Sequence, residues 1–236
     1  MANIKPTVDI IKEIVNSLTF TENILSLAQN GTEWTIKICD NHHLRPCSKI
    51  QINGSDYEVK SIDGSGCILI DTADSLSLGV LVIPAPFYIH GTWLAATDEI
   101  KKIPLSTDKF PLVYLFEVLN DKFNYNPRMT IGRESQLRLY FLDEADRDNW
   151  LTEDHYEGAI NPMTSLSIDF IEASRSSKIV LEGDEGLNEA DIKYHANFGK
   201  VVEEGHAKYL FPDNVSGTQM NVTIPFTKKG CEVCEC

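Results

Sequence analysis

The residues of this sequence best suited to chemistry are its six cysteines, three of which lie at the C-terminal end. Cys231, Cys234 and Cys236 form the pattern C-x-x-C-x-C, and thiolates at this spacing can hold a soft cation such as zinc. A closed tetrahedral site needs a fourth ligand, which must come from elsewhere in the chain or from a neighbouring subunit. An exposed oxidisable tail and a disulfide are the alternatives. We therefore expect no cofactor, and zinc on these thiols is the one exception that the sequence leaves open.

A second group of potential ligands lies nearer the N-terminus. Cys39, His42, His43 and Cys47 form the pattern C-x-x-H-H-x-x-x-C in a segment that reads as a loop between strands. The spacing is short for a zinc finger, and no second ligand pair follows it. We interpret these four residues as incidental loop residues.

The sequence holds no pattern typical of an enzyme. It contains no G-x-S-x-G elbow, no H-E-x-x-H helix and no C-x-x-C beside a βαβ unit. Gly64-Ser65-Gly66 indicates a hairpin turn rather than a phosphate-binding loop. His90, His155 and His195 have no evident nucleophile as a partner, and such histidines are mostly structural. We expect no catalytic residues and a protein that is not an enzyme.

Acidic residues outnumber basic ones by 35 to 21, which gives a net charge of −14. This charge argues against a general nucleic-acid surface, because it would repel phosphates. Two acidic stretches, Asp143–Glu157 and Glu182–Asp191, are interpreted as solvated faces; docking to a basic partner or to a divalent cation is the alternative. No apolar run is long enough to span a membrane, and the N-terminus does not resemble a signal peptide. We expect a soluble protein with no membrane partner.

Three regions with different periodicities must position these residues. Residues 1–30 form an N-terminal helical segment, with a helix over 7–18 and a further helical stretch over Thr21–Leu27. Residues 31–103 alternate polar and apolar positions in short runs separated by glycine turns, which predicts a small β-barrel or sandwich. The expected strands include Trp34–Ile38, Tyr57–Ile62 and Phe87–Leu94.

Residues 104–236 form the third region, an α+β domain that ends in the cysteine-rich tail. Short strands are predicted over Leu112–Phe116 and Leu137–Leu142, and two later strands over Ile192–Phe198 and Met220–Phe226. Between them, apolar residues from Tyr156 to Phe170 recur every three or four positions, as in a helix. Pro162 should kink or split that helix, because it removes a backbone donor and clashes with the carbonyl of Gly158.

The second half of the chain resembles a known group of viral proteins. The stretches FPLVYLFEV, RESQLRLYFLDEADRDNWLTEDHYEGAINPM and HANFGK, together with the cysteine-rich end, resemble virion proteins of crAss-like tailed phages of Bacteroidetes. The resemblance implies a non-enzymatic structural protein of the virion neck or tail, with a tail-terminator-like α+β domain. It implies a ring of identical subunits below the portal, a head–tail connector around the DNA channel.

The partners implied are copies of the chain itself, the adjacent portal, neck or tail proteins, and genomic DNA that passes through without sequence-specific binding. The protein would be made in the host cytoplasm and reside in the virion. Another tail subunit, such as a tube or fibre-adaptor protein, is the first alternative. A zinc-binding module that uses Cys231, Cys234 and Cys236 is the second.

Overall fold

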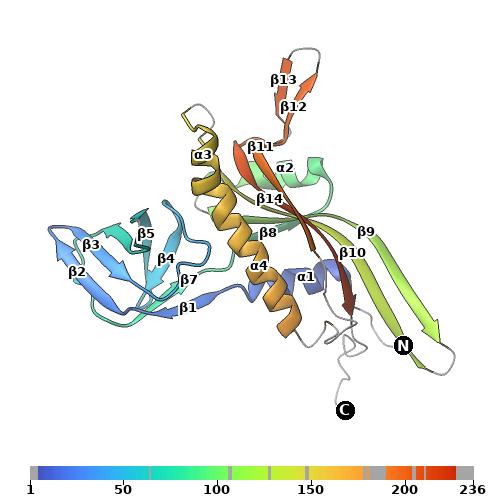
Figure 1. The fold of residues 1–236 in the computed structure, drawn as a ribbon, viewed down its shortest axis with the longest axis horizontal. Coiled ribbons are helices and arrows are strands. Elements are labelled where there is room, and N and C mark those ends of the chain that lie inside the picture. Colours follow the sequence, from blue (N-terminus) through green and yellow to red (C-terminus); the bar gives the residue numbers. More distant parts are fainter. Residues whose placement is uncertain are drawn as a thin grey trace.

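The computed structural model describes residues 5–63, 65–105, 108–126, 129–146, 149–177, 180, 190–203, 206–209 and 211–226. Strands dominate this part of the chain and form a seven-stranded sheet, a five-stranded sheet and a two-stranded hairpin. Three helical stretches accompany them, so the fold class is α+β, as expected. Figure 1 shows the seven-stranded sheet on one side of the molecule and the five-stranded sheet with the helices on the other.

The seven-stranded sheet, here called the curled sheet, has the order β1-β7-β4-β5-β6-β3-β2. Its strands are β1 (Phe20–Asn23), β2 (Ser26–Asn30), β3 (Glu33–Lys37), β4 (Lys49–Ile52), β5 (Ser55–Ile62), β6 (Ile68–Asp71) and β7 (Val80–Ile83). Because β1 and β2 follow one another in the chain but lie at opposite ends of the order, one stretch of backbone connects both edges. This connection curls the sheet into a half-barrel.

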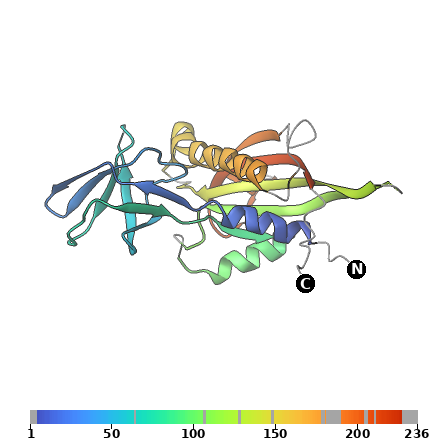
Figure 2. The same cartoon turned by 90° about the horizontal axis from the view of Figure 1, so that it is seen from below.

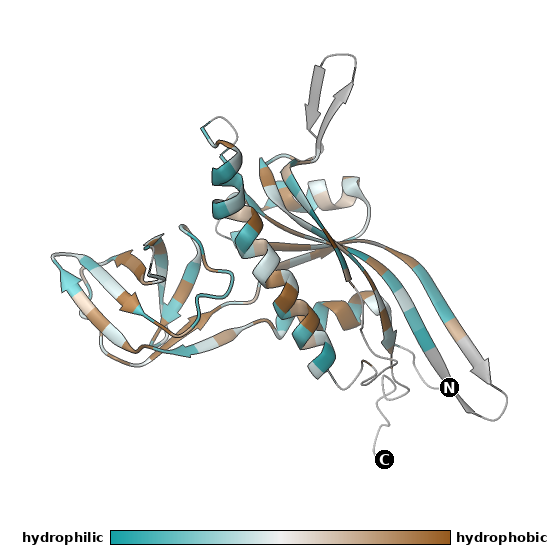
Figure 3. Cartoon of the chain, in the orientation of Figure 1, coloured by the Kyte–Doolittle hydropathy of each residue, from teal (hydrophilic) through white to brown (hydrophobic). Residues whose placement is uncertain are grey.

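Alternating side chains fill the inside of the curled sheet, as the period-two pattern predicts. Brown and teal segments accordingly alternate along its strands (Figure 3). Ile36, Ile50, Ile68 and Leu81 are fully buried in its core.

The expected helix over Thr21–Leu27 is wrong, because this stretch forms β1 and β2. Phe20–Asn23 pairs with β7, and Ser26–Asn30 pairs with β3. Exposure alternates along β1 between half-buried and exposed residues, which is the pattern of a strand. Pairing with two distant strands thus overrides a local apolar spacing that suits a helix.

The five-stranded sheet has the order β11-β14-β10-β9-β8, and only the β8–β9 pair is parallel. Its strands are β8 (Phe87–His90), β9 (Leu112–Asn126), β10 (Met129–Glu144), β11 (Ala190–Phe198) and β14 (Val215–Phe226). The four strands predicted for residues 104–236 are confirmed, but β9 and β10 are much longer than expected. The expected boundary between residues 103 and 104 falls between β8 and β9, which are hydrogen-bonded neighbours.

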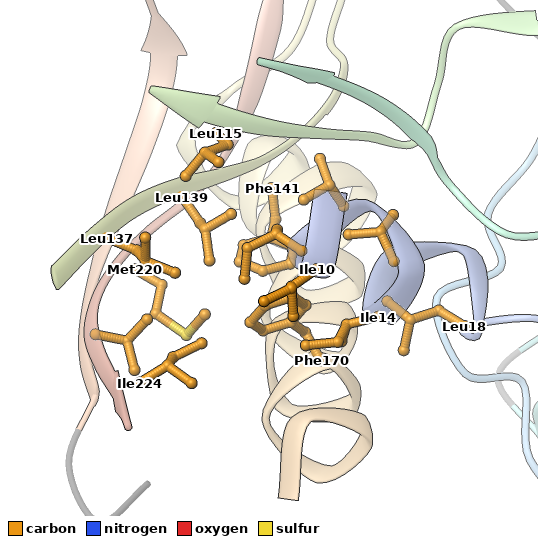
Figure 4. Packing of buried hydrophobic residues seen from close by; sticks show 14 of the residues in the cluster. Ile10, Ile14, Leu18, Leu115, Leu137, Leu139, Phe141, Phe170, Met220 and Ile224 are labelled. Carbon is orange, nitrogen blue, oxygen red and sulfur yellow. The ribbon is translucent and has the colours of Figure 1, made fainter. Parts of the chain in front are cut away.

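Helices cover both faces of this sheet. Val113, Leu115 and Leu139 pack with α1 (Thr7–Asn16) and α4 (Asn161–Ser176) on one face, where Figure 4 shows the cluster. Leu112 and Tyr114 point to the opposite face, towards α2 (Trp93–Lys102). Figure 2 shows α2 and α4 on opposite sides of the sheet. The helix predicted over residues 7–18 is therefore confirmed, whereas the sequence did not predict α2, which follows directly after a β8 that is shorter than expected.

The helix near Pro162 is not split as predicted; instead, its hydrogen-bonding pattern changes within a continuous helical stretch. Helix α3 (Thr152–His155) passes into a π-helical turn, η2 (Tyr156–Ile160), and then into α4, where Pro162 lies in the first turn. The wider turn accommodates a proline that lacks the backbone donor of a regular helix. A hairpin of β12 (Lys200–Glu203) and β13 (His206–Tyr209) was not predicted and projects from the sheet in Figure 1.

Candidate functional site

Ion pairs connect the curled sheet to the rest of the chain, and in each of them the basic residue lies on the side of the curled sheet. Each basic group comes from the stretch between β3 and the start of β4, and each acidic group comes from the α+β part. The pairs are Arg45–Asp143, Lys49–Asp108 and, when the imidazole is protonated, His42–Asp169. The two sides of this junction are thus complementary in charge, although the whole chain is strongly acidic.

The Arg45–Asp143 pair lies deepest in the junction. Asp143 has no exposed surface and Arg45 is 8 % exposed, and the guanidinium Nε contacts the carboxylate. Burial raises the pKa of Asp143 to about 6, although Arg45 acts in the opposite direction. The expectation that the stretch Asp143–Glu157 is a solvated face is therefore wrong at its first residue, because the apolar strand β10 carries Asp143 into the interior.

His42 lies between carboxylates from both sides of the junction. Its ring stacks on Phe20 with centroids 3.8 Å apart. Its Nε2 lies 3.2 Å from Glu22 Oε1, and its Nδ1 lies 4.0 Å from Asp169 Oδ2. Burial raises the pKa of Asp169, and His42 opposes this effect. Phe20 also packs against the cores of both parts, so His42 and Phe20 together form the centre of the contact.

His43 is buried beside the same contact and is 2 % exposed. Burial, followed by the charge of neighbouring His42, lowers the pKa of His43 to about 4, and a hydrogen bond to the Pro84 backbone offsets part of this effect. The ring is therefore neutral at neutral pH. It lines a cavity of about 210 Å³ together with Lys49 and Asp108.

The histidines and cysteines of this segment have different surroundings. Cys39 and Cys47 are exposed free thiols, whereas His42 and His43 are engaged at the junction. In the described part of the chain, no group of three or more His, Cys, Asp or Glu side chains could hold a metal ion. Cys231, Cys234 and Cys236 lie outside the described residues, so the zinc expectation stays a prediction.

The other histidines have structural partners. His155 is buried, and its Nδ1 lies 3.0 Å from the hydroxyl oxygen of Ser216. His90 is exposed at the end of β8, with its ring 6.0 Å from that of Tyr88. His195 lies on β11 beside Phe198, and burial lowers its pKa. Of the stretch Glu182–Asp191, only its last two residues are described, and Asp191 is exposed.

The long hairpin of β9 and β10 is the second feature that could act on other molecules. Among the described residues, β14 pairs with β10 as far as Arg133, and β8 pairs with β9 over Leu112–Leu115. From Phe116 to Asn126, no strand in the described ranges pairs with the outer edge of β9. Figure 1 shows the hairpin extending beyond the sheet. A strand edge without a paired neighbour presents a row of backbone N–H and C=O groups.

A polar network holds the base of this hairpin, in which Thr7, Arg133 and Ser135 are buried and Asp121 is exposed. Arg133 Nη2 lies 2.7 Å from Asp121 Oδ2, and Arg133 Nη1 donates to the Lys5 carbonyl at 2.7 Å. Thr7 Oγ1 lies 3.0 Å from Ser135 Oγ, and both hydroxyls contact Asp121. Burial alone would raise the pKa of Asp121, but the bonds from Arg133 and Ser135 outweigh it and hold that pKa below its usual value. The network ties α1 to both hairpin strands.

Aromatic rings complete the base of the hairpin. The Arg133 guanidinium lies 5.4 Å from the Phe123 ring centroid and 5.6 Å from that of Phe226. Cation–π contacts of this kind restrain the arginine in addition to its ion pair. Neither this network nor the Arg45–Asp143 pair is predicted by the sequence pattern. The one signal for the latter was an acidic residue that directly follows the apolar run of β10.

Comparisons with known proteins identify no relative. No protein-family model matches the chain, and neither a curated protein nor a solved structure matches it significantly. No helix within the described ranges is long and apolar enough to cross a membrane.

Proposed function

We propose that this chain is a structural subunit of a tailed-phage virion, which forms a ring in the neck or tail below the portal and joins head to tail around the DNA channel. The proposal combines the sequence resemblance with the open edge of β9. It assigns the protein no catalytic activity. Its partners would be copies of itself and the adjacent portal, neck or tail proteins.

The observation that carries the proposal is the projecting β9–β10 hairpin. An open strand edge is a template for pairing with another chain, and soluble proteins commonly protect such edges. Here the edge from Phe116 to Asn126 has no proline, and its base is fixed by the Arg133–Asp121 network. A stiff arm with an open edge suits a contact in which each subunit reaches the next, as a closed ring requires.

Exposed apolar side chains support an assembled state. Leu25, Leu78 and Val80 are 52 %, 65 % and 38 % exposed on the curled sheet. The backbone N–H of Ile24 donates to the carbonyl of Gly79, so the segments that carry Leu25 and Leu78 run side by side. Neighbouring exposed apolar residues often mark contacts with other proteins. The net charge of −14 also favours DNA that slides past the protein without binding.

A shortened hairpin tests the proposal in phage particles. Because Phe123 and Arg133 are opposite one another, residues 124–132 can be replaced by Asn-Gly, a two-residue turn that suits a hairpin. This variant keeps Arg133, Asp121, the folded body and the inner part of the edge (residues 116–123), and it removes the projecting tip with the outer part of the edge (residues 124–126). A matched control shortens the other projecting hairpin by joining Lys200 to Tyr209, which are also paired, through the same turn.

We expect the first variant to fold with unchanged thermal stability but to be lost from assembled particles, and the control to be incorporated. Incorporation of the first variant at the normal copy number would contradict the role of the hairpin, as would equal loss of both variants. Density for the chain along the whole tail, rather than in the neck, would favour a tube subunit instead.

A further inference from the structure

A crevice separates the curled sheet from the start of the long helix. It has a volume of about 490 Å³. One wall consists of residues from the curled sheet, including Leu44 and Arg45, and the other contains Trp150, Asp154 and Glu157. We call it the Trp150 crevice. Because both parts of the molecule line it, an occupant would contact both of them.

Trp150 forms a fixed wall of this crevice because of a glycine in the π-helical turn. A Cβ atom built on Gly158 would lie 2.6 Å from Trp150 Cη2, so the indole ring lies directly against the glycine backbone. The ring also contacts His155 with centroids 5.4 Å apart. Trp150 is half-buried, so part of the indole remains available to another group. π-helical turns frequently occur at functional sites.

The charge of the crevice is negative. Arg45 is neutralised by its pair with buried Asp143. Asp154 and Glu157 are exposed, and Asp154 accepts a hydrogen bond of 2.7 Å from the backbone N–H of Leu151. Among the salt bridges between described residues, none involves Glu157 or Asp154. A half-buried indole beside two carboxylates matches a guanidinium, which stacks on aromatic rings and bonds to carboxylates.

We propose that the Trp150 crevice binds an arginine side chain of a different, basic protein. Because the chain has 35 acidic and only 21 basic side chains, this acidic site is complementary in charge to a basic protein rather than to a second copy of the chain. Arginine suits the site better than lysine, since its planar group can stack on Trp150 while its N–H groups reach Glu157. The inference is independent of the proposed ring and holds for any basic partner.

The test uses the full chain and two small probes that differ in charge. N-acetyl-arginine amide and its uncharged analogue N-acetyl-citrulline amide are titrated while the indole N–H resonances of Trp34, Trp93 and Trp150 are followed by NMR. We expect a saturable shift of the Trp150 resonance with the arginine probe, which weakens as salt is added. The citrulline probe should cause no saturable shift.

Matched variants of the helix sharpen the test. Glu157→Gln should weaken binding of the arginine probe about two- to fivefold. Glu153→Gln is the control, because Glu153 is exposed on the same helix but does not line the crevice. Equal binding of both probes, equal shifts of all three indoles, or an unchanged affinity of Glu157→Gln would each overturn the inference.

Discussion

The burial of His43 predicts a specific loss of stability in acid. Its pKa is about 4 in the folded chain and 6.5 when unperturbed, so between these values the unfolded chain binds more protons than the folded one. The stability that neutral His43 contributes is therefore complete above pH 6.5 and is lost as the pH falls towards 4. A difference of 2.5 pH units corresponds to about 3 kcal/mol at pH 4.

The assay is urea unfolding of the wild type and of His43→Gln at several pH values between 8 and 4. Glutamine does not titrate, so the difference in unfolding free energy between the two proteins isolates His43. The raised pKa of Asp143 changes the unfolding free energy in the opposite direction. The folded chain holds this proton to a higher pH than the unfolded chain, so this group favours the folded state as the pH falls. Both proteins share that contribution, and it cancels in the difference.

We expect the stability advantage of the wild type over His43→Gln to shrink by about 3 kcal/mol between pH 8 and pH 4. His90→Gln is the control, since His90 is exposed at the end of β8, and it should follow the wild type at every pH. A constant difference between wild type and His43→Gln across this range would refute the reasoning, because His43 would then not be buried in its neutral form.

Three further outcomes are expected. Arg45→Met leaves buried Asp143 without its partner and should cost about 3–5 kcal/mol in urea unfolding, most of which the double variant Arg45→Met/Asp143→Leu should restore; a single variant as stable as the wild type would contradict the pair. Gly217→Ala places a Cβ 2.0 Å from the Phe141 carbonyl oxygen and should destabilise by about 3 kcal/mol, whereas Gly31→Ala has open space and should cost only about 1 kcal/mol for its positive φ; equal costs would argue against the close approach of β14 and β10. Removal of residues 231–236 should leave the melting temperature unchanged, and the full-length chain should contain no zinc when purified. Loss of the fold on truncation, or stoichiometric zinc in the full-length chain by metal analysis, would favour the zinc-binding alternative.

Local periodicity predicts the elements that it directly encodes. Trp34, Ile36 and Ile38 alternate with polar residues, and the strand expected there is β3. The apolar stripe from Val8 to Val15 predicts α1 for the same reason. Helix α2 could not be predicted from periodicity. Within the described chain, its only buried residues are Ala96 and Ile100, and two apolar positions are too few to define a helical pattern.

Contacts between distant residues could not be predicted. Thr21–Leu27 has helical spacing, but its pairing with β7 and β3 decides its conformation. Asp143 is buried at the end of β10 and pairs there with Arg45 from a remote loop, a contact between residues far apart in the sequence. Cys39 and Cys47 are candidate ligands by residue type, but the contacts at the junction are made by their neighbour His42, with Phe20 and Glu22. The sequence pattern could not reveal what His42 and His43 contact.

The most direct test of the proposed function is electron cryo-microscopy of the particle whose genome encodes this chain. The proposal predicts density for several copies arranged around the portal axis in the neck or upper tail, with the β9–β10 hairpin of each copy against its neighbour. Absence of the chain from purified particles would contradict the structural role. Copies that are present but do not touch one another through β9 would contradict the mode of assembly.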